Sequence, residues 1–424
     1  MKLAVISDTH FGDPHNLLVE PSGNGFEPGS RFEDFKEAAG KGNDYLVLLG
    51  DIFDFSVESY EKVFRAARIF FREVKKENIA NEIIYVPGNH DFDMWHTVEY
   101  QTRIIMRIES GELPDPFRLS VPAVIDGRKK PLGKHRLSLH GVTAKRGSYG
   151  GLFLDSIVGT SPDEKIVVNV AYPNIYLVSD DGTVMLTHGQ YFEPYWSLAG
   201  EWLMKVAQDD LQLGDAVDVR ELVGLNHPLS QLACSGIGQA GPLTPLVQVL
   251  EHEIKRRDLH RLRTYLDRLD NEIDRVTDYP WHKQYMELLT DAISNKTKKL
   301  IFELLENSRP TRFDKKKPHT PDFSQRFWSF FKAALCEIDD INQTGNSVPI
   351  PRWVVFGHTH CPIPWADPQA PRMQPQGITG MNPIRLYNTG GWINRETNDG
   401  RKEFCGAEVF LFDSDVGFTS VGVG

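Results

Sequence analysis

Short runs of apolar and β-branched residues recur along the chain and predict buried strands. In the first hundred residues these runs are 2–6 (KLAVI), 45–49 (YLVLL) and 83–86 (IIYV), each of a length typical of strands. Between the last two runs, residues 59–76 place apolar side chains along one helix face, namely Val63, Ala67, Phe70, Phe71 and Val74. This strand–helix–strand alternation predicts an α/β fold built in layers.

The rest of the chain contains further runs of this kind. The candidate strands are 136–140, 166–171, 174–178, 183–187, 353–356, 385–388 and 407–412. Asp181-Gly182 separates two of them and is a strong signal for a hairpin turn. We therefore expect a strand-rich core in which 174–178 and 183–187 form a hairpin.

Residues 196–345 have a different pattern, dominated by helical periodicity. Apolar residues alternate spacings of three and four along one predicted helix, namely Leu259, Leu262, Leu266, Leu269, Ile273 and Val276. Further helices are predicted at 284–306 and 323–340, with a polar, proline-containing break at 308–323. We interpret 196–345 as a helical insertion into a core formed by 1–195 and 346–424. The insertion either caps the substrate site or mediates formation of a homo-oligomer. The second role is included because a charged helical seam also suits dimerisation.

Composition and charge narrow the class of protein. A chain of 424 residues with 40% hydrophobic and 25% charged residues is ordinary for a globular protein of one or two domains. The formal net charge of -11 argues against a passive nucleic-acid binder, although it leaves open a nuclease with a local cationic site.

Cysteine usage and hydrophobicity bear on the compartment. The four cysteines are scattered and form no CxxC pair, which argues against a disulfide framework or a thiolate zinc site. The first apolar run is too short for a signal peptide, and no stretch reaches membrane-spanning length. With free thiols that suit a reducing compartment, these features predict a cytoplasmic protein without a transmembrane segment.

Polar side chains able to bind metal ions follow five of the predicted strands. They are Asp8 and His10 after 2–6, Asp51 after 45–49, Asn89 and His90 after 83–86, His188 after 183–187, and His358 and His360 after 353–356. Because ligand sites in open α/β sheets gather at the carboxyl ends of strands, we expect these side chains to converge. Carboxylate, imidazole and amide ligands without thiolate suit manganese, iron or zinc.

Taken together, these blocks resemble those of the calcineurin-like metallophosphoesterases. The family pattern DxH, GDxxD, GNHD or GNHE, a lone His and GHxH reads here Asp8-Thr9-His10, Gly50-Asp51-Ile52-Phe53-Asp54, Gly88-Asn89-His90-Asp91, His188-Gly189 and Gly357-His358-Thr359-His360. Each block alone is a weak signal, whereas the complete set in this order is highly specific. The resemblance covers about 1–195 and 346–424 and implies a four-layer α/β/β/α sandwich with two mixed sheets.

The resemblance also implies two divalent metal ions, for which manganese is preferred and iron or zinc would fit. One ion would be held by Asp8, His10, Asp51 and His360, and the other by Asp51, Asn89, His188 and His358. Asp51 would bridge them, because two dications about 3.5–4 Å apart need an anion between them. A hydroxide shared by the ions would be the nucleophile, since a bound metal lowers the pKa of water to about 7.

His90 belongs to neither implied ligand set. The resemblance makes it the general acid that protonates the leaving alkoxide, and it makes Asp91 the partner that orients its ring. Asp54 either supports the site in a similar way or is only a helix N-cap. Gln190 stands where many relatives have a second histidine, so one contact to the substrate is lost.

Two histidines compete for the position of the lone histidine. His188 and His140 each end a predicted strand and precede a glycine. We favour His188, because that position leads towards the GHxH block. The segment Asn388-Thr389-Gly390 resembles the Asn-x-Gly turn that follows GHxH in the family, and it is expected to support the backbone beside the site.

The resemblance predicts a hydrolase of phosphate mono- or diesters. The blocks at 7–13, 48–55 and 85–93 are similar to those of bacterial phosphodiesterases such as the UDP-diacylglucosamine hydrolases of lipid A synthesis. Those chains are much shorter, so their substrate is not carried over. A DNA or RNA nuclease of the same fold is an alternative, which the acidic net charge opposes. A non-catalytic scaffold is a third, opposed by the presence of His90 and of every ligand.

Overall fold

A computed structural model describes most of the chain. The described residues are 1–23, 25–142, 154, 157, 165–193, 197, 200, 217–231, 260, 261, 264, 268, 321–375, 380–396 and 401–424. The chain divides into two compact units, of which one comprises Met1–Gln239 with Phe313–Gly424 and the other comprises Ala240–Arg312. All the strands described below belong to the first unit.

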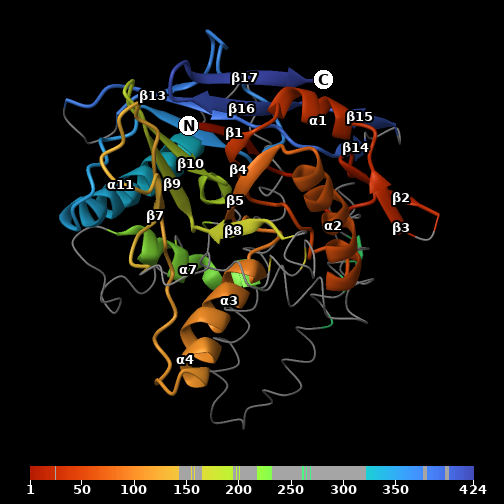
Figure 1. Cartoon of the computed structure of the whole chain (residues 1–424), viewed down its shortest axis with the longest axis horizontal. Helices are drawn as coiled ribbons and strands as arrows, with labels where there is room; N and C mark the ends of the chain where they lie inside the picture. The colour runs from red at the N-terminus through yellow and green to blue at the C-terminus, as the bar shows by residue number, and fades with distance from the viewer. Residues whose placement is uncertain are drawn as a thin grey trace, which may run out of the picture. The chain divides into compact units, whose positions relative to one another are not determined.

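One of the two large sheets of this unit has six strands in the order β17-β16-β1-β4-β5-β8 (Figure 1). Its strands are β1 (Lys2–Ile6), β4 (Asn43–Leu49), β5 (Ala80–Val86), β8 (Val167–Val170), β16 (Ala407–Asp413) and β17 (Gly417–Val423). β1, β4, β5 and β8 run parallel, whereas β16 pairs antiparallel with β1 and β17. The continuous burial of β1 and of the ends of β4 and β5 is typical of parallel strands covered on both faces.

The other large sheet has seven strands in the order β12-β13-β11-β10-β9-β6-β7. Its strands are β6 (Ala123–Asp126), β7 (Leu137–Leu139), β9 (Asn174–Val178), β10 (Thr183–Thr187), β11 (Trp353–Phe356), β12 (Arg372–Met373) and β13 (Ile384–Asn388). β10, β11 and β13 are parallel neighbours, and β9 pairs antiparallel with β10. The predicted hairpin is therefore confirmed, as is the α/β class with two mixed sheets.

Several helices and two small hairpins complete the described structure. The helices are α1 (Phe32–Ala39), α2 (Tyr60–Lys76), α3 (Asp93–Glu99), η1 (Tyr100–Ile105), α4 (Met106–Glu109), η2 (Gln190–Phe192), α7 (Val219–Gln231) and α11 (Pro321–Gln343). The hairpins are β2 (Val19–Ser22) with β3 (Gly25–Pro28), and β14 (Asn394–Glu396) with β15 (Lys402–Phe404). α2 buries the apolar face that its sequence predicted.

Aromatic contacts pack helices and sheets into one core. On the side of the first sheet, Phe70 of α2 lies 5.0 Å from Phe11, centroid to centroid. On the second sheet, the hydroxyl of Tyr176 in β9 donates to the carboxyl group of Glu337 in α11 at 2.7 Å. The two sheets face each other where Tyr387 of β13 contacts Phe410 of β16. The loops after β1, β4, β5, β10 and β11 therefore rest on a continuous core.

Only part of the predicted insertion can be compared with the structure. α11 confirms the helix predicted at 323–340, and α7 is a further helix within 196–345. The predicted seam at 259–276 lies outside the described residues except for four helical positions, and the helix predicted at 284–306 lies wholly outside them. Among the described helices, none is both long and apolar enough to cross a membrane.

Candidate metal centre

The predicted ligands lie on loops at the carboxyl ends of parallel strands in both sheets. Backbone hydrogen bonds join these loops directly. Asp8 N donates to Gly50 O at 3.0 Å, His10 N to Asp51 O at 2.9 Å, and Gly357 N to His188 O at 3.0 Å. Hydrogen bonds between the loop backbones therefore confirm the prediction that the strand ends bring these sequence blocks together.

Five candidate ligands have a left-handed backbone conformation, which residues other than glycine rarely adopt. The φ angles are 52° for Asp8, 49° for His10, 51° for Asp51, 66° for His358 and 52° for His360. Among the non-glycine residues that the structure describes, Asn78 alone shares this conformation. Backbone strain of this kind clusters at functional sites, where the surrounding structure holds it in place.

Two glycines allow the ligand loops to approach one another closely. A Cβ atom on Gly50 would lie 2.3 Å from Nδ1 of His188, and one on Gly88 would lie 2.3 Å from Oδ1 of Asp51. Both distances are far below van der Waals contact. These glycines therefore leave the space that the ligand side chains occupy.

Asp8, His10 and His360 form one group of converging ligand atoms. His360 Nε2 lies 3.1 Å from Asp8 Oδ1 and 3.1 Å from His10 Nε2. His10 Nδ1 lies 2.8 Å from Asp54 Oδ2, to which it donates a hydrogen bond. If the His10 ring is neutral, its one proton lies on Nδ1 in this bond, and Nε2 carries a lone pair. Nε2 then faces other atoms that can accept a hydrogen bond or bind a cation. Such a cluster fits a bound cation.

Asp51, His188 and His358 form a second group, with Asn89 beside it. His188 Nδ1 lies 2.9 Å from Leu49 O, to which it donates. Its Nε2 faces Asp51 Oδ2 at 3.2 Å and Asn89 Oδ1 at 3.2 Å. A neutral ring would present a lone pair to two oxygen atoms, so either a proton or a metal ion must lie on this side of the ring.

Two further observations test whether a metal ion fits. The buried Nδ1 of His358 has no hydrogen-bond partner among the described residues, and a buried polar atom without a partner is costly. Coordination to a metal ion would satisfy it. Asp51 Oδ2 lies between the groups, 3.2 Å from His188 Nε2 and 3.9 Å from His10 Nε2. The residues therefore fit two ions that share Asp51.

The electrostatics of the site favour cations. Burial opposes the ionisation of Asp51, but the charges of His188 and His90 hold the pKa of this carboxyl group well below its usual value. Burial likewise opposes protonation of His188, but the charge of Asp51 outweighs it and raises the His188 pKa to about 9. Protons and metal ions should therefore compete for the same positions.

His90 differs from the candidate ligands in its exposure. Its side chain is 31% exposed, whereas that of His360, at 17%, is the most exposed of the other candidate histidines. Its Nδ1 contacts Asp54 Oδ1 at 3.0 Å and Ser56 Oγ at 2.8 Å. Burial lowers the His90 pKa, but the charges of Asp54 and Asp51 outweigh it and raise the pKa to about 9.

Asp54, not Asp91, is the partner of His90. The carboxylate of Asp91 accepts backbone hydrogen bonds from Gly88 at 2.6 Å and from Ile52 at 2.7 Å, and so holds two ligand loops together. The expectation that Asp91 orients His90 is thus corrected, because the turn directs its side chain to the backbone. The alternative role of Asp54 as a helix N-cap is also excluded, since Ser59 precedes α2.

The structure separates the two competing histidines. His188 lies in the second ligand group, whereas His140 follows β7, the edge strand of the second sheet, outside the ligand groups found among the described residues. The predicted support from Asn388 is confirmed, because its side chain donates to Gly357 O at 2.7 Å. Gln190 is buried and donates to the hydroxyl of Tyr172 at 3.4 Å.

Glu193 lies beside the site but was not predicted from the sequence. Its Oε2 lies 3.3 Å from His358 Nε2, and its side chain is 19% exposed. Glu193 follows the lone-histidine block by five positions and belongs to no motif, so only the spatial contact identifies it.

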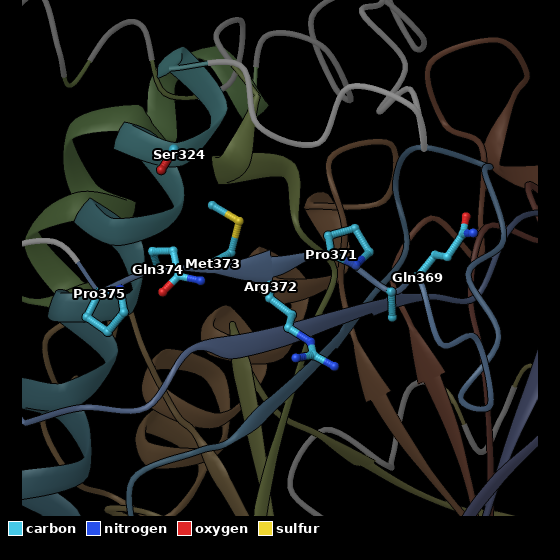
Figure 2. Close-up of a pocket in the computed structure, with 8 residues that line it drawn as sticks. Ser324, Gln369, Pro371, Arg372, Met373, Gln374 and Pro375 are labelled. Atoms are coloured by element: carbon cyan, nitrogen blue, oxygen red, sulfur yellow. The ribbon is translucent and has the colours of Figure 1, made fainter.

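A hollow of about 580 Å³ lies between the start of α11 and β12. Figure 2 shows Met373 directed towards Ser324, while the side chain of Arg372 points the other way. None of the residues that line this hollow is a candidate metal ligand.

The comparison with protein families agrees with the geometry. The family model described as calcineurin-like phosphoesterase matches residues 1–193. The matched segment includes the candidate ligands from Asp8 to His188, and the structure adds His358 and His360 from beyond it. No curated protein matches the chain.

Proposed function

Through residues 1–193 the chain belongs to the calcineurin-like phosphoesterase superfamily, and we propose that it hydrolyses phosphate mono- or diesters at a centre of two divalent metal ions. The observation that carries this proposal is the convergence of two groups of ligand atoms around Asp51. In our assignment Asp8, His10, Asp51 and His360 hold one ion, and Asp51, Asn89, His188 and His358 hold the other.

The side chains of the site have separate tasks in this proposal. When bound, the two ions supply an activated nucleophile and positive charge that offsets the phosphate charge. His90, the most exposed histidine of the site, donates a proton to the leaving oxygen. Asp54 keeps His90 oriented and protonated through the bond to Nδ1. Asp91 keeps the loops that carry Asp51 and Asn89 together.

We extend the proposal to the architecture. The packing of α2 beside the first sheet and of α11 against the second supports a four-layer α/β/β/α sandwich. Residues 196–345 would form a helical insertion in a core of 1–195 and 346–424. Glu193 contacts His358 directly before this range, which favours a cap over the substrate site, while formation of a homo-oligomer remains the alternative role.

The preferred metal and the compartment are also proposals. Oxygen and imidazole ligands without thiolate suit manganese, with iron or zinc as alternatives. Among the described cysteines, Cys336 and Cys405 are free thiols, which suits a reducing compartment such as the cytoplasm.

The proposed function can be tested by a substrate screen. Metal-stripped protein would be supplied with manganese, iron or zinc and assayed on phosphomonoesters, phosphodiesters, single-stranded DNA and RNA. We expect metal-dependent hydrolysis of small phosphate esters. Exclusive cleavage of nucleic acid would favour the nuclease alternative, and no hydrolysis of any ester with any of these metals would refute the proposal.

A further inference from the structure

Glu193 and His358 form a contact that no motif of the chain predicts. The carboxylate Oε2 of Glu193 lies 3.3 Å from Nε2 of His358. A carboxylate at this distance favours a proton on Nε2 of the ring over one on Nδ1. A neutral histidine that donates from Nε2 has its lone pair on Nδ1.

The other nitrogen of the same ring gives an independent observation. His358 Nδ1 is buried and has no hydrogen-bond partner among the residues described. His358 also groups with Asp51 and His188, and the ligand atoms of the three residues lie within 4.8 Å of one another. One nitrogen is therefore held by a carboxylate while the other is free to coordinate an ion, as is common for histidine ligands in metalloproteins.

The elements that precede Glu193 and His358 hold these two residues close to each other. Glu193 directly follows Phe192 at the end of η2, and His358 lies two residues after Phe356 of β11. The rings of Phe192 and Phe356 pack with centroids 5.5 Å apart at an angle of 69°. Phe192 also packs on Phe327 and Phe330 of α11. This aromatic cluster supports both partners of the contact.

We propose that Glu193 is a positioning residue of the metal centre, which holds the proton of His358 on Nε2 and so presents Nδ1 to the ion shared with Asp51 and His188. This inference rests on the proposed two-metal function. It assigns Glu193 a role through His358 rather than through the substrate. Removal of such an outer partner typically lowers metal affinity by about 10–100-fold.

The test uses the full-length protein and measures affinity for manganese by competition with a chelator. We expect Glu193→Ala to weaken binding of one ion by about 10–100-fold and Glu193→Gln to weaken it less, because the amide oxygen can still accept from Nε2. Glu61→Gln, which changes an exposed glutamate of α2 with a 72% exposed side chain, is the matched control and should bind as the wild type does.

Chemical rescue separates positioning from structural support. Glu193 is partly exposed, so acetate can reach the space left in Glu193→Ala, and we expect added acetate to restore much of the lost affinity. Unchanged affinity in Glu193→Ala would overturn the inference while leaving the proposed function intact. A loss that acetate does not restore, together with a lower melting temperature, would also overturn it by showing a structural role. A wild type without bound divalent ions would overturn both proposals.

Discussion

Asp51 connects the two ligand groups, because its Oδ2 lies near both His188 and His10. Asp51→Asn keeps the shape of the side chain and removes the negative charge between the proposed dications. We expect this variant to lose at least one ion and to fall to background activity, because the side chain shared by both ions no longer carries a negative charge that offsets their repulsion. Elemental analysis would check this result, with Asp34→Asn as control, in an aspartate of α1 whose side chain is 43% exposed. Two ions retained in Asp51→Asn would contradict the bridging role.

His90 should behave differently from a ligand. We expect His90→Ala to keep both ions while turnover falls by roughly 10²–10⁴-fold, the usual contribution of a general acid. The loss should be smallest for a good leaving group such as p-nitrophenolate, which needs little protonation, and largest for an alkoxide. Steady-state kinetics on both kinds of ester would measure it.

In the structure, His10, Asp51 and His90 form a further group of atoms able to hold a metal ion. The alternative to the role of general acid is therefore that His90 is a metal ligand. If His90 is a ligand, His90→Ala should lose metal in elemental analysis, as Asp51→Asn does. An equal loss of turnover on good and poor leaving groups would instead argue against proton donation. Either outcome would reassign His90.

At the scale of elements, the strands that lead to the site were the most predictable. β1, β9, β10 and β11 have the predicted bounds, because each is a compact apolar run between polar residues. β4 and β5 begin before their apolar runs, since the polar residue Asn43 pairs with Ala80 in the ladder. β17 was not predicted, because its glycines and exposed positions show no apolar pattern and only pairing with β16 makes it a strand.

Glu337 attaches α11 to β9, and the burial of its carboxyl group predicts that stability depends on pH. Its carboxyl group accepts hydrogen bonds from Asn174 and Tyr176 of β9, but burial outweighs these bonds and raises its pKa. Between the unfolded pKa of about 4.3 and the raised folded pKa, the folded state keeps a proton that the unfolded state has lost. Stability attributable to Glu337 therefore falls as pH rises through this range, by up to about 1.4 kcal/mol per pH unit.

Glu337→Gln should remove this dependence. We expect the melting temperature of the wild type, relative to that of Glu337→Gln, to be lower at about pH 8 than at about pH 5. Differential scanning calorimetry at both pH values would measure the difference. A wild type that gains stability relative to the variant as pH rises would show that the folded state prefers the charged carboxylate.

At the scale of the whole molecule, the sequence predicted which residues lie together in the site. It did not predict which side chains hold them in place. The blocks that carry the ligands could be found because strand ends converge in α/β sheets. The choice between the two predicted roles of Asp54, and the contact of Glu193, could not be found in this way, because local sequence does not reveal side-chain direction at a tight turn or contacts between loops. The seam at 259–276 lies largely outside the described residues, so the role of the insertion stays a prediction.

We propose that one site of this chain binds two divalent ions and uses them to cleave phosphate esters. The most direct measurement is a titration of metal-stripped protein with manganese, in which bound ions and hydrolysis of bis(p-nitrophenyl) phosphate and p-nitrophenyl phosphate are followed together. We predict saturation at two ions per chain, with activity on at least one ester that appears as the site fills and disappears on chelation. Full activity in protein shown by elemental analysis to contain no metal would contradict the account.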